Sequence, residues 1–175
     1  MLAEASFRRA ERADALCLSV LAMQVFLDTY ATDGIRPLLA REVLETLSPE
    51  AISAILDAPA SAVIVAERAD HLIAFGQLTL GGTHALVPDS RSTELNRLYV
   101  QERFTGHGLG GGLLREAEAL AAAAGASTLW LTAWTGNERA LTFYPRQGYR
   151  AVGATMYEFG GEQFENRLFS KALTC

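Results

Sequence analysis

The segment Glu94-Leu95-Asn96-Arg97-Leu98-Tyr99-Val100, with the turn Phe104-Thr105-Gly106-His107-Gly108-Leu109-Gly110 that follows it, decides the fold of this chain. The segment has the composition of a strand, and a helical pattern runs from about Gly108 to Ala124, where Gly125 can end it. The apolar run Ser127 to Trp134 then predicts a buried strand. A strand, a helix and a second strand in this order form a crossover connection, so we expect the two strands to lie parallel.

The sequence on either side of this unit predicts further strands and helices. The strand patterns are Ser6 to Arg9, Ala62 to Glu67, Leu72 to Leu80, Tyr149 to Phe159 and Gln163 to Leu173. The helical patterns follow Asp14, and then run from Pro37 to Leu47, from Pro49 to about Leu56 and from Asn137 to Gln147. We therefore expect an α/β fold with one mixed, mostly antiparallel, seven-stranded sheet and helices on both faces, in a single domain of residues 1–175.

The first long helical pattern is apolar on more than one side. Leu16 and Val20 recur at helical spacing, while Leu18 belongs to another face, so we expect a helix that is buried on most sides. Asp14 stands where a helix N-cap is expected. Cys17 falls within the same apolar run, and we expect it to be a buried thiol.

Composition argues against several classes of protein. The net charge of -5 disfavours nucleic acid as the main partner, because phosphate backbones require clustered Lys and Arg. Cys17 and Cys175 make neither a disulfide framework nor a metal-ligand spacing, and we expect no metal. The segment Met1 to Arg12 lacks the apolar core of a signal peptide, and Ala13 to Leu27 is too short to span a bilayer. We therefore expect a soluble cytoplasmic protein without a membrane partner.

The glycine-rich turn from Gly106 to Gly112 is suited to holding phosphate. Helix N-termini expose unpaired backbone N–H groups with a partial positive charge, and glycines let a ligand approach that backbone closely. A P-loop requires Gly-Lys-Ser/Thr where this chain has Gly-Gly-Leu-Leu, and a dinucleotide-binding motif requires an acidic residue at the end of the next strand, which ends Leu131-Thr132-Ala133-Trp134. The alternative stays open that the glycines only allow the helix to pack closely on the strand.

Two linked motifs resemble the GNAT superfamily of N-acetyltransferases. Glu94 to Val100 with Phe104 to Gly110 looks like that family's fourth strand and pyrophosphate loop. Asn137 to Tyr144, with Gly148-Tyr149 close behind, looks like its second cofactor motif. Within the superfamily, the Leu-x-Arg-Leu-Tyr-Val strand is similar to the branch that includes bacterial polyamine acetyltransferases. The resemblance implies an enzyme that transfers an acetyl group from acetyl-CoA to a primary amine of a small molecule or peptide.

The resemblance also implies a set of cofactor contacts. They are Leu98, Tyr99, Val100, Thr105, Gly106, His107, Gly108, Leu109, Gly110, Asn137, Ala140, Phe143 and Tyr144. The amides of the loop would bind the pyrophosphate, Asn137 would bind the pantetheine, and the Val100 amide would polarise the thioester carbonyl. Thr105 stands where the family usually has Gln or Arg, so one charge-assisted contact is missing, which Arg103 or His107 could partly replace.

Tyr144 is the residue that the resemblance implies for chemistry, because a phenol can protonate the departing CoA thiolate. Pro145 follows directly and disfavours a helical conformation at Tyr144, so we expect some displacement of the hydroxyl. Glu94 is our candidate for the base that accepts the proton of the amine, with His84 and Glu67 as alternatives. The sequence shows no Ser/His/Asp or Cys/His arrangement, so we expect direct attack in a ternary complex.

The sequence leaves the acceptor open among polyamines, amino acids, antibiotic amines and protein N-termini. Phe26, Tyr30 and Trp134 are candidates to line its pocket, with packing in the core as the alternative for each. An acidic chain suits a cationic amine, and a homodimer is compatible with the sequence. A GNAT-fold module that binds CoA as a regulatory ligand without turnover is the second hypothesis.

Overall fold

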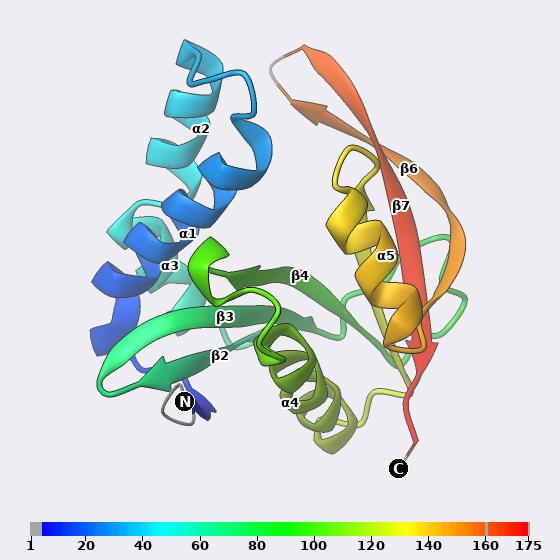
Figure 1. The fold of residues 1–175 in the computed structure, drawn as a ribbon. Helices are drawn as coiled ribbons and strands as arrows, with labels where there is room; N and C mark the ends of the chain where they lie inside the picture. The colour runs from blue at the N-terminus through cyan, green and yellow to red at the C-terminus, as the bar shows by residue number, and fades with distance from the viewer. Residues whose placement is uncertain (1–4, 160, 175) are drawn as a thin grey trace. The chain divides into compact units, whose positions relative to one another are not determined.

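Figure 1 shows the computed structural model, which describes residues 5–159 and 161–174. Its strands are β1 (Ser6–Arg9), β2 (Ser61–Arg68), β3 (His71–Leu80), β4 (Ser92–Val100), β5 (Thr128–Trp134), β6 (Arg150–Phe159) and β7 (Glu162–Ala172). Its helices are α1 (Ala15–Tyr30), α2 (Pro37–Thr46), α3 (Pro49–Asp57), α4 (Leu109–Ala123) and α5 (Glu138–Arg146), with short 3-10 turns η1 (Arg12–Asp14) and η2 (Glu102–Phe104). The strands form one seven-stranded sheet in the order β1-β2-β3-β4-β5-β7-β6, which confirms the predicted fold class.

The chain divides into two compact units, each built from two separate stretches of sequence. The described part of the first unit is residues 5–78 and 97–117. The second takes residues 79–96 and 118–174, of which residue 160 is not described. The strands β3 and β4 and the helix α4 each continue from one unit into the other. That these units form a single domain stays a prediction.

The core of the first unit forms where α1 and α3 pack on the sheet, and α1, α2 and α3 lie together in Figure 1. It includes Leu18 of α1, Ile52 of α3, Val65 of β2 and Phe75 of β3, each with at most 4% of its surface exposed. Burying side chains of this size stabilises the fold by roughly 1.5–3 kcal/mol each. Ser48 caps α3 through its hydroxyl, as the sequence predicts.

The helix α1 is buried on one side only, so the prediction that most of its sides are buried is wrong. Leu16 and Val20 are exposed over 63% and 61% of their surfaces, and Cys17 is exposed rather than a buried thiol. The sheet covers a single face of the helix, and apolar residues outside that face meet solvent. Among the described residues, Arg12–Tyr30 is the one helical stretch long and apolar enough to cross a membrane, a test that core helices also pass.

Asp14 occupies the N-cap position of α1, as the sequence predicts, but its side chain makes no cap hydrogen bond to the helix. Its carboxylate accepts two hydrogen bonds from the Arg8 guanidinium, at 2.7 and 2.9 Å, and one from the Glu11 backbone N–H at 2.7 Å. Arg8 also donates to Glu67 at 2.7 Å, so one cation on β1 links β2 to the start of α1. The Arg8 hydrogen bonds are the main cause that lowers the pKa of Asp14 below its usual range.

The helix α4 covers the opposite face of the strands in the first unit. Phe7 of β1 lies beside Ala66 of β2, so both point away from the face on which Val65 meets α1. The Phe7 ring packs so closely on Gly112 of α4 that an added Cβ would collide with it. Helices therefore lie on both faces of the sheet, as predicted.

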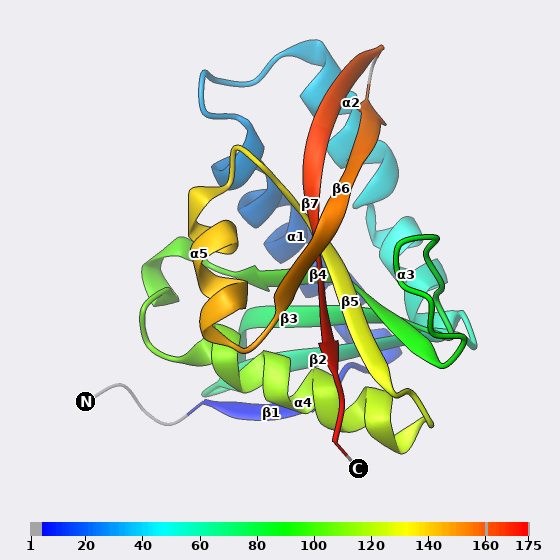
Figure 2. The same cartoon turned by 90° about the vertical axis from the view of Figure 1, so that its right-hand side faces the viewer.

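The second unit contains the predicted parallel pair. Ser92 to Glu94 of β4 lie opposite Thr128 to Trp130 of β5, in parallel. On its other edge, β5 pairs antiparallel with β7, and β7 pairs with β6 in the long hairpin seen in Figure 2. Gly160 of the predicted hairpin turn lies outside the described residues, as does Cys175. A bulge interrupts the β6–β7 register between Ala151 and Gly153.

A polar network joins α4 to β7 in the second unit. The Lys171 ammonium donates to both oxygens of the Glu118 carboxylate, at 2.8 and 2.9 Å, and the Tyr149 hydroxyl donates to the same group at 3.0 Å. The side chains of Lys171 and Glu118 are only 29% and 18% exposed. Burial, followed by the Glu118 charge, raises the pKa of Tyr149, so its phenol stays protonated and can donate.

The substitution Glu118→Gln should lower the free energy of unfolding by roughly 1–2 kcal/mol, because the half-buried Lys171 ammonium loses its charged partner. Glu116→Gln, at an exposed position of the same helix, is the control and should change the stability by less than about 0.5 kcal/mol. Denaturant titrations of the three proteins measure the difference. Equal stabilities for both variants would contradict this role of the network.

Candidate active site

Two glycines give the turn between β4 and α4 its shape. Gly106 and Gly108 have φ angles of 77° and 81°, in the left-handed region that other residues disfavour. The space around both is open, since a Cβ added at either position would meet no atom within 4 Å. The helix α4 begins at Leu109, and the Gly112 N–H donates to the Gly108 carbonyl at 2.9 Å. The backbone N–H groups at the start of α4, before Gly112, have no helical carbonyl four residues earlier to bind. The turn is therefore suited to an anionic ligand.

Thr105 and His107 stabilise this turn from within. The Thr105 hydroxyl donates to the Glu102 carbonyl at 2.8 Å, and His107 Nδ1 lies 2.8 Å from the Thr105 carbonyl oxygen. The Thr105 backbone N–H donates to the same carbonyl at 3.1 Å, so both donors of Thr105 already have partners within the turn. Both Arg103 and His107 are exposed.

The remaining candidates of the first unit come from β4 and α1. Leu98, Tyr99 and Val100, all half-buried, form the end of β4. The rings of Phe26 and Tyr30, one turn apart on α1, have centroids 4.6 Å apart. Phe26 and Tyr99 pack on the same core cluster, so packing already accounts for part of their surface.

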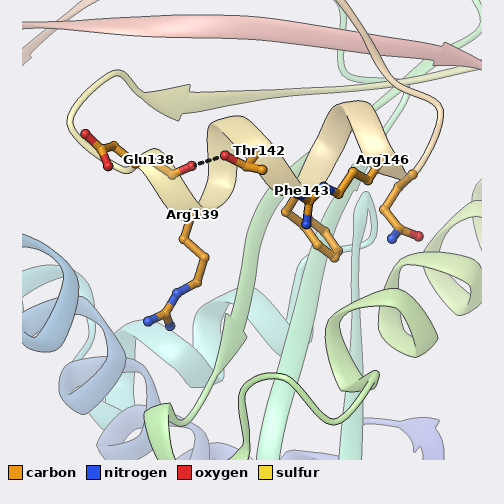
Figure 3. Close-up of a pocket in the computed structure, with 6 residues that line it drawn as sticks. Glu138, Arg139, Thr142, Phe143 and Arg146 are labelled. Carbon is orange, nitrogen blue, oxygen red and sulfur yellow. Dashed lines mark hydrogen bonds between the residues drawn. The ribbon is translucent and has the colours of Figure 1, made fainter.

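The helix α5 carries the cofactor candidates of the second unit. Asn137 caps it, with Oδ1 accepting the Ala140 N–H at 3.1 Å, so the side-chain nitrogen of Asn137 is the group left for a ligand. In Figure 3, Arg139 and Phe143 extend from the same side of α5. An open hollow of about 530 Å³ is lined there by Glu138, Arg139, Thr142, Phe143, Arg146 and Gln147.

Tyr144 is held in an aromatic cluster and is only 8% exposed. Its ring centroid lies 5.1 Å from that of Phe143 and 5.8 Å from those of Tyr149 and Phe169. Contacts on several sides fix the orientation of the ring. An immobilised phenol is the kind of group that can deliver a proton to a defined point.

Tyr144 keeps a helical conformation despite Pro145, so the prediction that Pro145 disfavours the helix there is wrong. Displacement of the Tyr144 hydroxyl stays a prediction. Pro145 lies inside α5, and the helix continues to Arg146. Since Pro145 falls in the last turn, the ladder loses one N–H donor, while the Gln147 N–H still donates to the Phe143 carbonyl at 3.2 Å.

Glu94 ends a chain of hydrogen bonds in the second unit. The Thr79 hydroxyl donates to Asn96 Oδ1 at 2.8 Å. The Asn96 side chain in turn hydrogen-bonds Glu94, so the amide N–H groups face the carboxylate. Burial raises the pKa of Glu94, while the Asn96 hydrogen bond and the nearby His84 act in the opposite direction.

The loop after β3 and the strand β5 enclose Glu94 on two sides. A Cβ added at Gly82 would lie 3.1 Å from Glu94 Cβ, so glycine lets the loop cross close to this residue. Trp130 lies beside Glu94 in the parallel register, and its Nε1 donates to the Gly82 carbonyl at 2.9 Å. The His84 ring packs at 5.1 Å from the Trp130 ring.

The two alternative bases belong to different units. Glu67 belongs to the first unit and is bound to Arg8, whereas His84 shares the second unit with Glu94. Trp134, an acceptor-pocket candidate, is also in the second unit, with its ring at 6.4 Å from that of Phe164.

Sequence reasoning missed Asn96, which acts on Glu94, and Thr79, which hydrogen-bonds Asn96. Asn96 could have been found, because residues two apart on a strand point to the same face. Thr79 gave no such signal, since its contact depends on how β3 lies beside β4.

The comparison with protein families agrees with this arrangement of turn, helix and strands. The model of the acetyltransferase (GNAT) family matches residues 32–149. The chain belongs to this family. An uncharacterized N-acetyltransferase of Lactobacillus delbrueckii is 24% identical over 153 residues, 87% of this chain and 88% of that protein. An uncharacterized N-acetyltransferase of Mycobacterium tuberculosis is 28% identical over 122 residues, 70% and 74% of the two chains.

Solved structures of acetyltransferases share the fold of this GNAT chain. The PaiA N-acetyltransferase of Thermoplasma acidophilum, in complex with coenzyme A, superposes with a TM-score of 0.76 at 21% identity, covering 97% of this chain and 99% of that one. A GNAT acetyltransferase of Streptococcus pneumoniae gives a TM-score of 0.73 at 24% identity, with 98% and 100% covered. The predicted superfamily is confirmed.

The hydrogen bond from Asn96 makes a prediction about the ionisation of Glu94. Asn96→Ala should raise the pKa of Glu94 further, because the bond it removes favours the carboxylate. Thr79→Val should act in the same direction, since it frees the Asn96 amide to rotate, whereas Thr79→Ser keeps the hydroxyl and should change little. Carbon-13 NMR titration measures the pKa of Glu94, with its carboxyl signal assigned through Glu94→Gln. An unchanged pKa of Glu94 in Asn96→Ala would exclude the hydrogen bond.

Proposed function

We propose that the protein is an N-acetyltransferase that moves an acetyl group from acetyl-CoA to a primary amine of a small molecule or peptide. The observation that carries the proposal is the glycine turn at the start of α4, where Gly106 and Gly108 leave backbone N–H groups approachable by a diphosphate. Membership of the acetyltransferase family supports acetyl transfer as the reaction. The PaiA structure with coenzyme A and a Salmonella typhimurium acetyltransferase structure with acetyl-CoA, at 16% identity, support the choice of cofactor.

The chain offers suitable donors for acetyl-CoA. The open space at Gly106 and Gly108 admits a diphosphate close to the backbone. Backbone N–H groups of the loop from Thr105 to Gly110 are the proposed donors to it, although the N–H of Thr105 itself donates to the Glu102 carbonyl at 3.1 Å. In this proposal the Val100 N–H polarises the thioester carbonyl and the Asn137 side-chain nitrogen binds the pantetheine. Bound acetyl-CoA supplies an activated acetyl group.

Glu94 is proposed as the base that removes a proton from the attacking amine, directly or through water. An amine must lose this proton before it can attack, and a Lys-like amine has a reference pKa near 10.4. A carboxylate with a pKa raised by burial is a better proton acceptor than an exposed one. The Asn96 side chain lowers the pKa of Glu94, against the effect of burial, and so favours the carboxylate form that accepts the proton.

Tyr144 is proposed as the acid that protonates the CoA thiolate. Its neighbours, Phe143 and Tyr149 among them, hold the ring in one orientation, which a proton donor requires. With Cys17 on the exposed side of α1, the residues proposed here include no thiol nucleophile, and the amine attacks acetyl-CoA directly in a ternary complex. We further propose a cytoplasmic location, a small-molecule or peptide partner, and no nucleic-acid or membrane partner.

A module that binds CoA without turnover is the second candidate. It is favoured by Thr105, whose hydroxyl binds the Glu102 carbonyl and which has no charge to offer a phosphate. Release of free thiol from acetyl-CoA in the presence of an amine panel separates the two candidates. CoA binding by calorimetry without thiol release for any amine would favour the module, and absence of CoA binding would exclude both.

Gly108→Ala should raise the KM for acetyl-CoA about tenfold, because a side chain at a φ of 81° strains the turn and misplaces its amides. Gly125→Ala is the matched control, since Gly125 has a φ of 90°, has equally open surroundings and follows α4 at its other end. Both variants should lose similar thermal stability, but only Gly108→Ala should lose affinity. Equal KM values for the two variants would remove the turn from the cofactor site.

Tyr144→Phe should lower kcat about a hundredfold while the KM for acetyl-CoA stays close to that of the wild type. The ring contacts persist in this variant, so the loss reports the hydroxyl itself. Tyr157→Phe, at a tyrosine of β6 that is 51% exposed, is the control. Steady-state thiol release at neutral pH measures both, and an unchanged kcat in Tyr144→Phe would exclude it as the acid.

A further inference from the structure

Arg97 of β4 is a half-buried cation whose recorded contact is with a neutral group. Within the described residues, its hydrogen bond runs from Nη1 to Oε1 of Gln77 on β3, and it takes part in no ion pair. A guanidinium removed from bulk water normally requires an anion or several acceptors to offset its lost hydration. The chain contains 20 acidic residues, so the absence of a carboxylate here is not a matter of composition.

Two of the other three half-buried cations in the described part of the chain are paired with carboxylates. Arg8 binds the carboxylates of Asp14 and Glu67, and Lys171 binds Glu118. Arg68 stacks over the Phe104 ring at 5.0 Å. Arg97 differs from these three because its partner is a single amide oxygen.

Gln77 adds further donors at the same point. The residue is only 8% exposed, and its carbonyl oxygen accepts from Arg97, which orients its NH2 group away from that bond. Among the described residues this nitrogen makes no hydrogen bond, yet it is not one of the fully enclosed polar atoms, so it reaches solvent. Arg97 retains unused N–H groups as well. The pair therefore presents donors and almost no free acceptor, which is the requirement for binding a carboxylate.

The pair lies on the face of the sheet that α1 covers. Phe75 and Tyr99 pack into the α1 core cluster, and Gln77 and Arg97 stand two residues from them on β3 and β4. The Phe26 and Tyr30 rings of α1, tilted against each other, belong to the same unit. A ligand held by Arg97 would therefore lie on the side of the sheet that carries α1.

We propose that Arg97, oriented by Gln77, binds a carboxylate of the acceptor, so that the enzyme acetylates an amine that also carries a carboxylate, as in an amino acid. The inference rests on the proposed acetyl transfer. It favours amino-acid-like acceptors over polyamines, because a purely cationic acceptor would be repelled by the guanidinium.

The test compares α-amino acids with their own amides as acceptors, which differ by the carboxylate alone. The wild type should prefer phenylalanine over phenylalaninamide, and other such pairs, by about tenfold or more in kcat/KM after correction for the fraction of free amine. Arg97→Gln should abolish this preference by raising the KM for the amino acid, while the KM for the amide stays unchanged. Arg97→Lys should retain part of the preference. Arg41→Gln, at an exposed arginine of α2, is the control and should keep the full preference.

A binding measurement separates this inference from the proposed function. N-acetylphenylalanine should shift the NMR signal of the Arg97 Nε–H, and N-acetylphenylalaninamide should not, whether or not acetyl transfer occurs. No preference in the wild type, or an Arg97 signal that both compounds leave unmoved, would overturn the proposal. A rise in the KM for acetyl-CoA in Arg97→Gln, with the acceptor preference intact, would assign Arg97 to a cofactor phosphate and overturn it as well.

Discussion

The parallel pairing of β4 with β5 is the constraint on which the proposed site depends. Parallel neighbours cannot be joined by a short hairpin, so the chain needs a crossover, and α4 supplies it. The helix has to begin soon after β4 ends, and the left-handed Gly106 and Gly108 make that abrupt start feasible. A helix that starts at a sharp turn presents its first N–H groups to solvent, which is the basis of the proposed diphosphate contact. The same pairing sets Glu94 beside Trp130.

The strand β4 also carries two charged side chains in half-buried surroundings, and a neutral amide holds each of them. Asn96 hydrogen-bonds Glu94, and Gln77 hydrogen-bonds Arg97. A neutral amide can hydrogen-bond a charged group and leave its charge uncompensated, whereas an oppositely charged partner would compensate that charge. Arg8 and Lys171, which stabilise the fold, are by contrast paired with carboxylates. The distinction between amide partners and charged partners supports a role for Glu94 and Arg97 in contact with a ligand.

Most of the fold could be predicted because its signals are local. Strand composition, the Ser48 cap and the left-handed glycine that ends α4 each depend on a few neighbouring residues. The errors arose where the outcome depends on distant partners. The apolar sequence of α1 gives no indication that only one of its faces would meet the sheet, which leaves Cys17 exposed. Asp14 has the chemistry of a cap, but Arg8 of β1 is the stronger partner for its carboxylate.

The sequence by itself determined the order of the elements, the glycine turn and the family, because glycine conformation, helix caps and strand alternation are properties of short segments. It also identified Glu94 and Tyr144 as candidates. Only the tertiary structure decided which groups surround them: the Thr79–Asn96 chain at Glu94, the aromatic neighbours of Tyr144, and the Gln77 amide at Arg97. The physical reason is that hydrogen bonds and burial between residues far apart in sequence depend on strand register and on the faces that pack together.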